Sequence, residues 1–356
     1  MDRRSTSALL LTLALPLAQE KPPVTPPGRV EERVTVRRVV LTGRVIDRFA
    51  NAIPGLARSD FRLRVDGAET AIESVEWIPA RPAPAPDPAR AQAQTAPEPA
   101  AESVPQAPPR RIVLLFQWEI AGQKDVGFVR MMRQAKRFLD SAGPDDRVAV
   151  LGYGSSLRLL QDFTTDRAAV EAAIEKVRSP SWSGRLENAG GPTLFGAAAG
   201  GCGRTDSIEK ALLCIGNALA EVPGPKTMLF FGWTAATTKE TWRNEYPAIL
   251  EAIERAETSV SVLDVSDGRR VSNKPVLLGS LKSLAADTGG LYNETFDFPD
   301  LARLRVERSL DGSYELVFRG PAAGRGWHDV EIVLTGREGT ALFPRWYRDA
   351  PDVSSR

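Results

Sequence analysis

The sequence predicts an α/β protein with a doubly wound, Rossmann-like domain, in which a mostly parallel sheet is covered by helices. Two observations predict this class. Apolar runs alternate with helical patterns over residues 110–302, as in repeated strand–helix units. Residues 29–78 and 303–349 instead alternate apolar and polar side chains, as half-buried strands do. We therefore expect a small N-terminal β-sandwich-like module and a C-terminal β-hairpin extension beside the α/β domain.

Residues 1–19 have the composition of an export signal. The cationic segment MDRRSTS precedes an apolar run from Ala8 to Ala18, which is shorter than the ~20 residues that span a bilayer. No later stretch of the sequence is long and apolar enough to span one. We expect a periplasmic or secreted protein with no transmembrane segment in the mature chain. The alternative is an N-terminus that is merely apolar.

The β module at residues 29–78 is followed by a linker at residues 79–109. In the module, RVTVRRVVLTGRVID and DFRLRVDG alternate in character, and Asp66-Gly67 is a hairpin signal. A module of this length is marginal in size to fold alone. The linker consists mostly of Pro and Ala and carries no aromatic residue, so we expect a semi-rigid spacer without a packed core.

The expected elements of the α/β domain follow one another from Arg111. The run IVLLFQ is typical of a parallel strand that is buried on both faces. A helix is expected over residues 125–140, and Asp166 is placed to cap a helix at AAVEAAIEKV. Further expected elements are the strands RVAVLGY, TMLFFG, SVSVLDV and GLYNE, with helices at about 205–221, 241–257 and 276–287. The last strands, SYELVFRG and HDVEIVLTG, are joined by PAAGRGW, which predicts a hairpin.

Composition excludes several classes of function. Lys and Arg number 46 against 45 Asp and Glu, so there is no cationic surplus for binding nucleic acid. One histidine, His328, and two cysteines are too few for a Cys/His zinc site, and we expect His328 at the surface. Cys202 and Cys214 are expected to form a disulfide in an oxidising compartment. The alternative is two free thiols, with Cys214 in the core.

Four stretches of the chain carry a resemblance to a known family. They are GRVIDRFANAIPGLARSDFRLRVDGAETAIESVEW, DRVAVLGYGSSLRLLQDFTTDRAAVEAAI, LKSLAADTGGLYNE and FPRWYR. Their order resembles the bacterial VWFA-related secreted proteins, known mainly from Acidobacteria, which contain a von Willebrand factor type A (VWA) domain. The resemblance covers about residues 30–349 apart from the linker. It implies a metal-ion-dependent adhesion site with the pattern Asp-x-Ser-x-Ser after the first strand, a later Thr, and an Asp after the fourth strand.

On this chain the adhesion-site pattern is largely lost. The first Asp falls at Gln117, the two Ser at Glu119 and Ala121, the Thr at Thr193, and the second Asp at Trp233. Mg²⁺ requires oxygen ligands and usually an anionic anchor, and Glu119 is the one carboxylate among these side chains. We therefore expect a degenerate site that holds no metal or other cofactor.

Tryptophans stand where the pattern is lost. Trp118 and Trp233 come directly after apolar runs, so they are expected at the carboxyl edge of the sheet, and Trp182 lies in a loop. Exposed tryptophans are enriched among the residues that dominate protein interfaces. The hypothesis is an interaction face composed of Trp118, Glu119, Trp182, Thr193 and Trp233. The alternative is that the indoles simply cover the strand ends.

Two classes of function remain open. The favoured one is a non-enzymatic, exported VWA-domain protein that mediates protein–protein interaction or adhesion in the cell envelope or extracellular space. The alternative is a Mg²⁺-dependent VWA binding module, or a hydrolase that uses carboxylates such as Glu119 with Asp125 or Asp267. The binding module is favoured because no nucleophile–base pair is visible and because the spacer suits a reaching adhesin.

Overall fold

The computed structural model describes six stretches of the chain, all of which belong to one structural unit, Val36–Arg356. These stretches are residues 38–80, 109–118, 125–177, 205–266, 274–321 and 326–349. The predicted export signal and nearly all of the predicted linker lie outside them. No helix in the described stretches is long and apolar enough to cross a bilayer.

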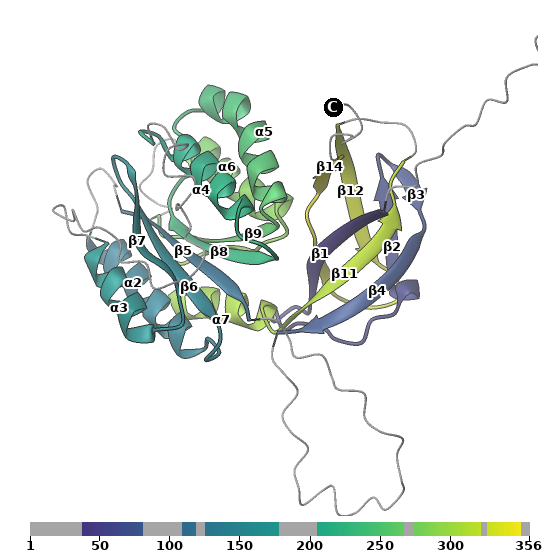
Figure 1. Cartoon of the computed structure of the whole chain (residues 1–356), viewed down its shortest axis with the longest axis horizontal. Helices are drawn as coiled ribbons and strands as arrows, with labels where there is room; N and C mark the ends of the chain where they lie inside the picture. The colour runs from purple at the N-terminus through teal and green to yellow at the C-terminus, as the bar shows by residue number, and fades with distance from the viewer. Residues whose placement is uncertain are drawn as a thin grey trace, which may run out of the picture. The chain divides into compact units, whose positions relative to one another are not determined.

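A six-stranded sheet forms the centre of the α/β domain (Figure 1). Its strand order is β10-β9-β8-β5-β6-β7, and every neighbouring pair is parallel except β6 and β7. The predicted α/β class with a mostly parallel sheet is therefore confirmed. The strands are β5 (Arg111–Gln117), β6 (Arg147–Tyr153), β7 (Leu157–Thr164), β8 (Lys226–Gly232), β9 (Thr258–Asp264) and β10 (Tyr292–Glu294).

Helices cover both faces of this sheet, and each face has its own apolar core. One core contains Leu115 and Met228 from the strands and Leu212 from a helix, whereas the other contains Leu114 and Val170. Successive side chains of a strand point to opposite faces of the sheet. Because both faces of this sheet are covered by helices, its strands must be apolar along their length. The helices are α2 (Asp125–Asp140), α3 (Arg167–Lys176), α4 (Ile208–Ala220), α5 (Lys239–Arg255), α6 (Lys274–Asp287) and α7 (Pro299–Ser309).

The start of helix α3 agrees with the predicted cap, whereas helix α7 was missed. The Asp166 side chain accepts hydrogen bonds from the N–H groups of Ala168 and Ala169 at the start of α3, as predicted. Helix α7 was not predicted. It has Pro299 in its first turn, but it buries little more than Ala302 and Val306, so its apolar stripe is too narrow to stand out in the sequence.

Two four-stranded antiparallel sheets form a β-sandwich. Their strand orders are β13-β1-β11-β4 and β14-β12-β2-β3, so each sheet combines strands from before and after the α/β domain. The strands are β1 (Arg38–Ile46), β2 (Phe61–Val65), β3 (Ala68–Thr70), β4 (Ile72–Pro79), β11 (Gly312–Arg319), β12 (Trp327–Leu334), β13 (Thr340–Leu342) and β14 (Trp346–Arg348), with a 3₁₀ turn at Arg58–Asp60.

The sandwich differs from the expected N-terminal module with a separate hairpin tail. The hairpin prediction is wrong, because β11 pairs with β1 and β4 while β12 pairs with β2 and β14 in the other sheet. The two terminal regions share one core, in which Tyr314 stacks edge-on against Phe61 at 5.5 Å between ring centroids. Four short N-terminal strands enclose too little apolar surface alone, and the later strands complete the core.

The predicted surface position of His328 is also wrong. His328 is 4% exposed and stacks on Tyr347, which lies opposite it on β14, with 4.9 Å between ring centroids. Its Nδ1 lies 2.7 Å from Asp66 and its Nε2 lies 3.2 Å from Asp349. Burial by itself lowers the pKa of His328, but the hydrogen bonds to both carboxylates outweigh it and the pKa is raised.

Candidate functional site

The carboxyl edge of the parallel sheet is where the sequence places a candidate site. Gln117 ends β5 and is 2% exposed. Its Oε1 accepts hydrogen bonds from the backbone N–H groups of Trp233, at 3.0 Å, and Thr234, at 3.3 Å. Both donors lie just beyond the end of the neighbouring strand β8. The amide therefore joins two strand ends, and its oxygen is occupied by protein donors.

The segment after β8 is held by buried polar side chains. Glu209, on α4, is fully buried and accepts a hydrogen bond from the Thr237 hydroxyl at 2.7 Å as well as one from the Thr237 N–H. Ser280 Oγ accepts from the Ala235 N–H at 3.2 Å. The Glu209 carboxylate is therefore engaged in holding the loop after β8, because buried backbone N–H groups need hydrogen-bond acceptors.

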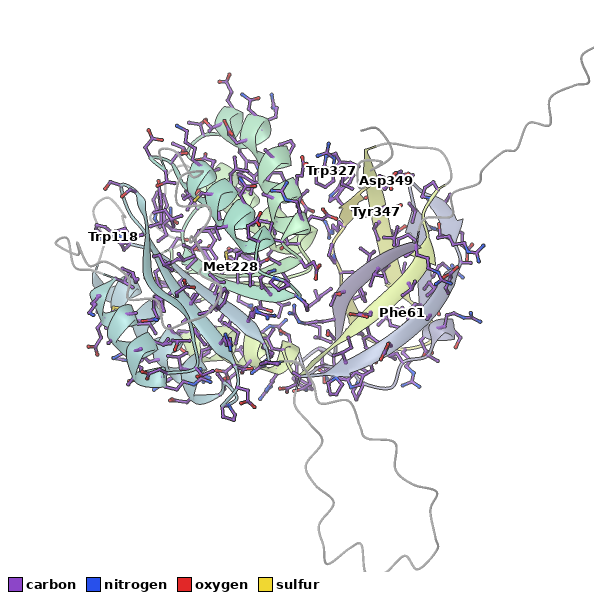
Figure 2. All side chains as sticks on the ribbon, viewed as in Figure 1. Phe61, Trp118, Met228, Trp327, Tyr347 and Asp349 are labelled. Atoms are coloured by element: carbon purple, nitrogen blue, oxygen red, sulfur yellow. The ribbon has the colours of Figure 1, made fainter. Side chains whose placement is uncertain are left out.

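Trp118 covers the end of strand β6 (Figure 2). Its backbone N–H donates to the Tyr153 carbonyl at 3.0 Å, and its ring lies so close to Gly154 that a Cβ there would be 2.3 Å from it. The Arg158 guanidinium lies 5.2 Å from the ring centroid, within cation–π range. The buried indole N–H has no acceptor among the described residues.

Trp118 and Trp233 are both half-buried and pack against the same apolar core. The structure thus brings Gln117, Trp118 and Trp233 to one edge. The other predicted members, Glu119, Ala121, Trp182 and Thr193, lie outside the described residues.

Only one of the two cysteines of the predicted disulfide belongs to the described residues. Cys214 is 4% exposed on α4, whereas Cys202 lies outside the described residues. The pairing therefore stays a prediction.

Asp264, at the end of β9, is a carboxylate at this edge that the sequence pattern did not place. It is 1% exposed, and burial raises its pKa. The Tyr292 hydroxyl donates to its Oδ2 at 2.6 Å, and the Ser266 N–H donates to its Oδ1 at 2.9 Å. Burial and this carboxylate also raise the pKa of Tyr292. Both oxygens thus have partners within the protein.

The described residues at this edge do not fit a divalent cation. The one oxygen that Gln117 offers is occupied, and an indole has no lone pair to give. Nowhere in the described stretches do three or more His, Cys, Asp or Glu side chains come together as a metal site requires. The described part of this edge therefore presents half-buried indoles and no set of metal ligands.

No known family pattern matches the chain, and no curated protein matches it. Among solved structures, the chain is similar to the conserved hypothetical protein BatB from Bacteroides thetaiotaomicron, with 13% identity, 56% of this chain and 96% of that chain covered, and a TM-score of 0.38. It is also similar to a von Willebrand factor type A protein from Catenulispora acidiphila, with 9% identity, 88% of this chain and 72% of that chain covered, and a TM-score of 0.39. A third similar structure is the manganese-loaded TRAP protein of Plasmodium vivax, with 11% identity, 66% of this chain and 92% of that chain covered, and a TM-score of 0.38. The similar structures thus include VWA proteins, but likenesses this distant carry no argument about function.

Proposed function

We propose that this chain is a non-enzymatic, exported interaction module of the VWA type, which binds a protein partner in the envelope or extracellular space without a metal. The contact surface is the carboxyl edge of the parallel sheet, around Trp118 and Trp233. Glu119, Trp182 and Thr193 complete this face, and a Cys202–Cys214 disulfide ties a neighbouring loop to α4.

One observation carries the proposal: the side chain at the first adhesion-site position is used inside the protein. Gln117 accepts two backbone hydrogen bonds and joins the ends of β5 and β8. A metal ligand must keep its oxygen free for the ion, so this arrangement supports contact by surface complementarity. Two half-buried indoles beside it supply apolar area, which suits protein recognition.

The competing functions are a Mg²⁺-dependent binding module and a carboxylate-based hydrolase. Both require free carboxylates at this edge. The described ones are engaged, Glu209 with Thr237 and Asp264 with Tyr292. These contacts favour the metal-free interaction module.

Thermal unfolding with Mg²⁺, Mn²⁺ and EDTA separates the metal-free module from its competitor. A ligand present at 100 times its Kd stabilises the folded state by about 2.7 kcal/mol, which is readily measured as a rise in Tm. We expect no change in Tm with either ion or with EDTA. A saturable rise with Mg²⁺ that EDTA reverses would refute the metal-free site.

Partner capture tests the interaction face itself. Trp118→Ala combined with Trp233→Ala is expected to lose envelope proteins that the wild-type chain retains. Trp242→Ala is the matched control, because Trp242 is also half-buried but stacks on Tyr246 within α5. Circular dichroism must show that both variants fold. Equal recovery of partners by the double variant and the control would exclude this edge as the contact surface.

A further inference from the structure

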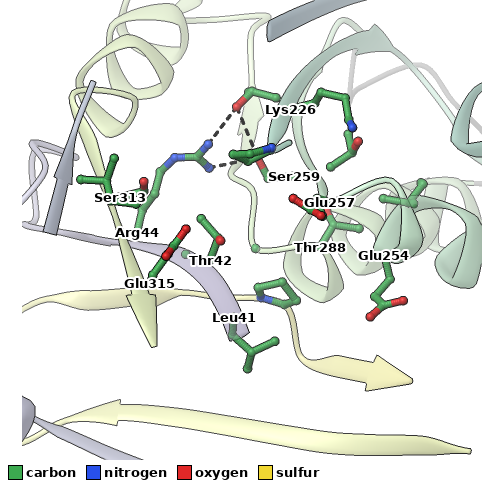
Figure 3. Close-up of a pocket in the computed structure, with 18 of the residues that line it drawn as sticks. Leu41, Thr42, Arg44, Lys226, Glu254, Glu257, Ser259, Thr288, Ser313 and Glu315 are labelled. Atoms are coloured by element: carbon green, nitrogen blue, oxygen red, sulfur yellow. Dashed lines mark hydrogen bonds between the residues drawn. The ribbon is translucent and has the colours of Figure 1, made fainter. Parts of the chain in front are cut away.

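A second candidate site lies at the amino ends of the parallel strands, opposite the edge described above. A cavity of about 470 Å³ opens there between the first residues of β8 and β9 and the sandwich strands β1 and β11 (Figure 3). Small-molecule sites have volumes of roughly 300–1,000 Å³, so this cavity is large enough for a small ligand. It does not share residues with the proposed interaction face.

Arg44, on β1, points into this cavity and carries an unpaired charge. Its guanidinium donates to Thr227 Oγ1 at 2.8 Å and to Ser259 Oγ at 3.1 Å, and both partners are neutral (Figure 3). No described carboxylate forms an ion pair with it. Burial, together with the charge of Arg110, lowers the pKa of Arg44 to about 10, so the side chain remains a cation at neutral pH.

A desolvated guanidinium with neutral partners favours an anionic ligand. Burying a charge is costly unless an opposite charge compensates it. Arginine has five N–H donors in a planar fork that matches a carboxylate, and Arg44 uses two of them. The remaining donors are therefore suited to bind a carboxylate group.

Glu315, on β11 of the same sheet, is a carboxylate that has no cationic partner among the described residues. It pairs in register with Thr42, two residues before Arg44 on β1, so the two charged side chains share a face. Burial, with the charges of Glu76 and Glu257, raises the pKa of Glu315. Within the described chain it has neither an ion-pair nor a hydrogen-bond partner. This carboxylate therefore favours a cationic group.

The rest of the wall supplies charges of both signs, with Lys226, Arg111 and Arg255 as cations, and an apolar surface. Glu254 and Glu257 stand beside the cavity on the α/β side, where Arg348 already donates a backbone hydrogen bond to Glu254 (Figure 3). Leu250 and Pro344 supply apolar surface. Both signs of charge are therefore present, and Arg44 and Glu315 are without ion-pair partners in the described chain, so a ligand with a single carboxylate and a cationic end would meet an opposite charge at each end.

We propose that this cavity binds a small zwitterion with an apolar body, of the amino-acid or short-peptide class. Its carboxylate pairs with Arg44, its ammonium group lies at Glu315, and its apolar part packs on Leu250 and Pro344. The site is independent of the proposed interaction function, because it lies at the other end of the sheet.

The test is direct binding to the full chain. The twenty common L-amino acids and the dipeptide leucyl-leucine are screened by thermal shift, and isothermal titration calorimetry then compares the best binder with its amide and its N-acetyl derivative. We expect saturable binding that weakens at least tenfold when either the carboxylate or the ammonium group is blocked. Absence of saturable binding by every probe, or equal binding by a blocked derivative, would overturn the assignment.

Variants locate the binding site. Arg44→Gln and Glu315→Gln are each expected to weaken binding of the unblocked ligand at least tenfold. Arg64→Gln is the matched control, because Arg64 is exposed on β2 and pairs with Glu331 at 3.3 Å. Should Arg44→Gln fold poorly, Glu315→Gln still tests the site, since Glu315 makes no bond whose loss would unfold the sandwich. Undiminished binding by Glu315→Gln would overturn the proposal.

Discussion

The two ends of the parallel sheet satisfy their polar groups in different ways. At the carboxyl end, Gln117 meets two backbone N–H groups and Glu209 meets Thr237, so these two side chains have partners within the protein, whereas the Trp118 indole N–H has none among the described residues. At the amino end, Arg44 and Glu315 line one cavity without pairing. Ligands of doubly wound proteins usually bind at the carboxyl end. Here the unpaired charges lie at the other end, which shows that the fold alone does not determine where a ligand can bind.

The difference has an energetic side. A buried hydrogen bond contributes modestly when made, but leaving its partner unsatisfied costs about 1–3 kcal/mol per group. A buried charge without a counter-charge lowers stability in the absence of ligand. Substitutions at the carboxyl end should therefore be more destabilising than removal of a full charge at the amino end.

The largest effect is expected for Gln117→Leu. Leucine retains most of the volume but leaves the N–H groups of Trp233 and Thr234 unsatisfied, so we expect the free energy of unfolding to fall by about 3 kcal/mol. Urea unfolding of the variant and the wild type measures this difference in the free energy of unfolding. Gln161→Leu is the control, because the Gln161 amide is half-buried and reaches only the neighbouring Asp162 carbonyl. Equal losses in the two variants would mean that the Gln117 amide does not hold the two strand ends together.

An intermediate, pH-dependent effect is expected for Lys226→Met at the amino end. Burial lowers the pKa of Lys226 to about 8, although the charge of Glu257 raises it in part. The unfolded chain then binds more protons than the folded chain between about pH 8 and pH 10.5, so wild-type stability rises with pH across that window. Lys226→Met should be the more stable protein at pH 7, and its advantage should shrink by about 2 kcal/mol by pH 10.

The comparison between the two ends supplies the control for this titration. The stability loss caused by Gln117→Leu should be the same at pH 7 and pH 10, because an amide binds no proton in this range. Unfolding curves at both pH values decide the matter. A constant difference between Lys226→Met and the wild type would show that Lys226 is not desolvated in the folded state.

The smallest effect is expected for Arg44→Met without ligand. The substitution removes two hydrogen bonds to hydroxyl groups, but it also removes a desolvated charge, so the free energy of unfolding should change by less than about 1 kcal/mol. Chemical denaturation checks this value. A loss above about 3 kcal/mol would identify Arg44 as a structural clamp between β1 and the strands β8 and β9.

Local patterns made the α/β domain predictable. The apolar runs, the helix at α2 and the Asp166 cap all appear where the sequence indicates them, because strand burial and helix capping depend on residues close together in the chain. The positions of Gln117, Trp118 and Trp233 at strand ends followed from the same runs. What Gln117 binds did not follow, because its partners lie 116 and 117 residues away along the chain, just after strand β8.

By itself the sequence determined the α/β class and the order of most strands and helices of the α/β domain. Only the tertiary structure decided that strands from both ends of the chain share a sandwich, that His328 is buried between Asp66 and Asp349, and that Arg44 faces a cavity. The physical reason is separation along the chain. Arg44 and Ser259 are 215 residues apart, and Asp66 and His328 are 262 apart, so no local periodicity records that they meet.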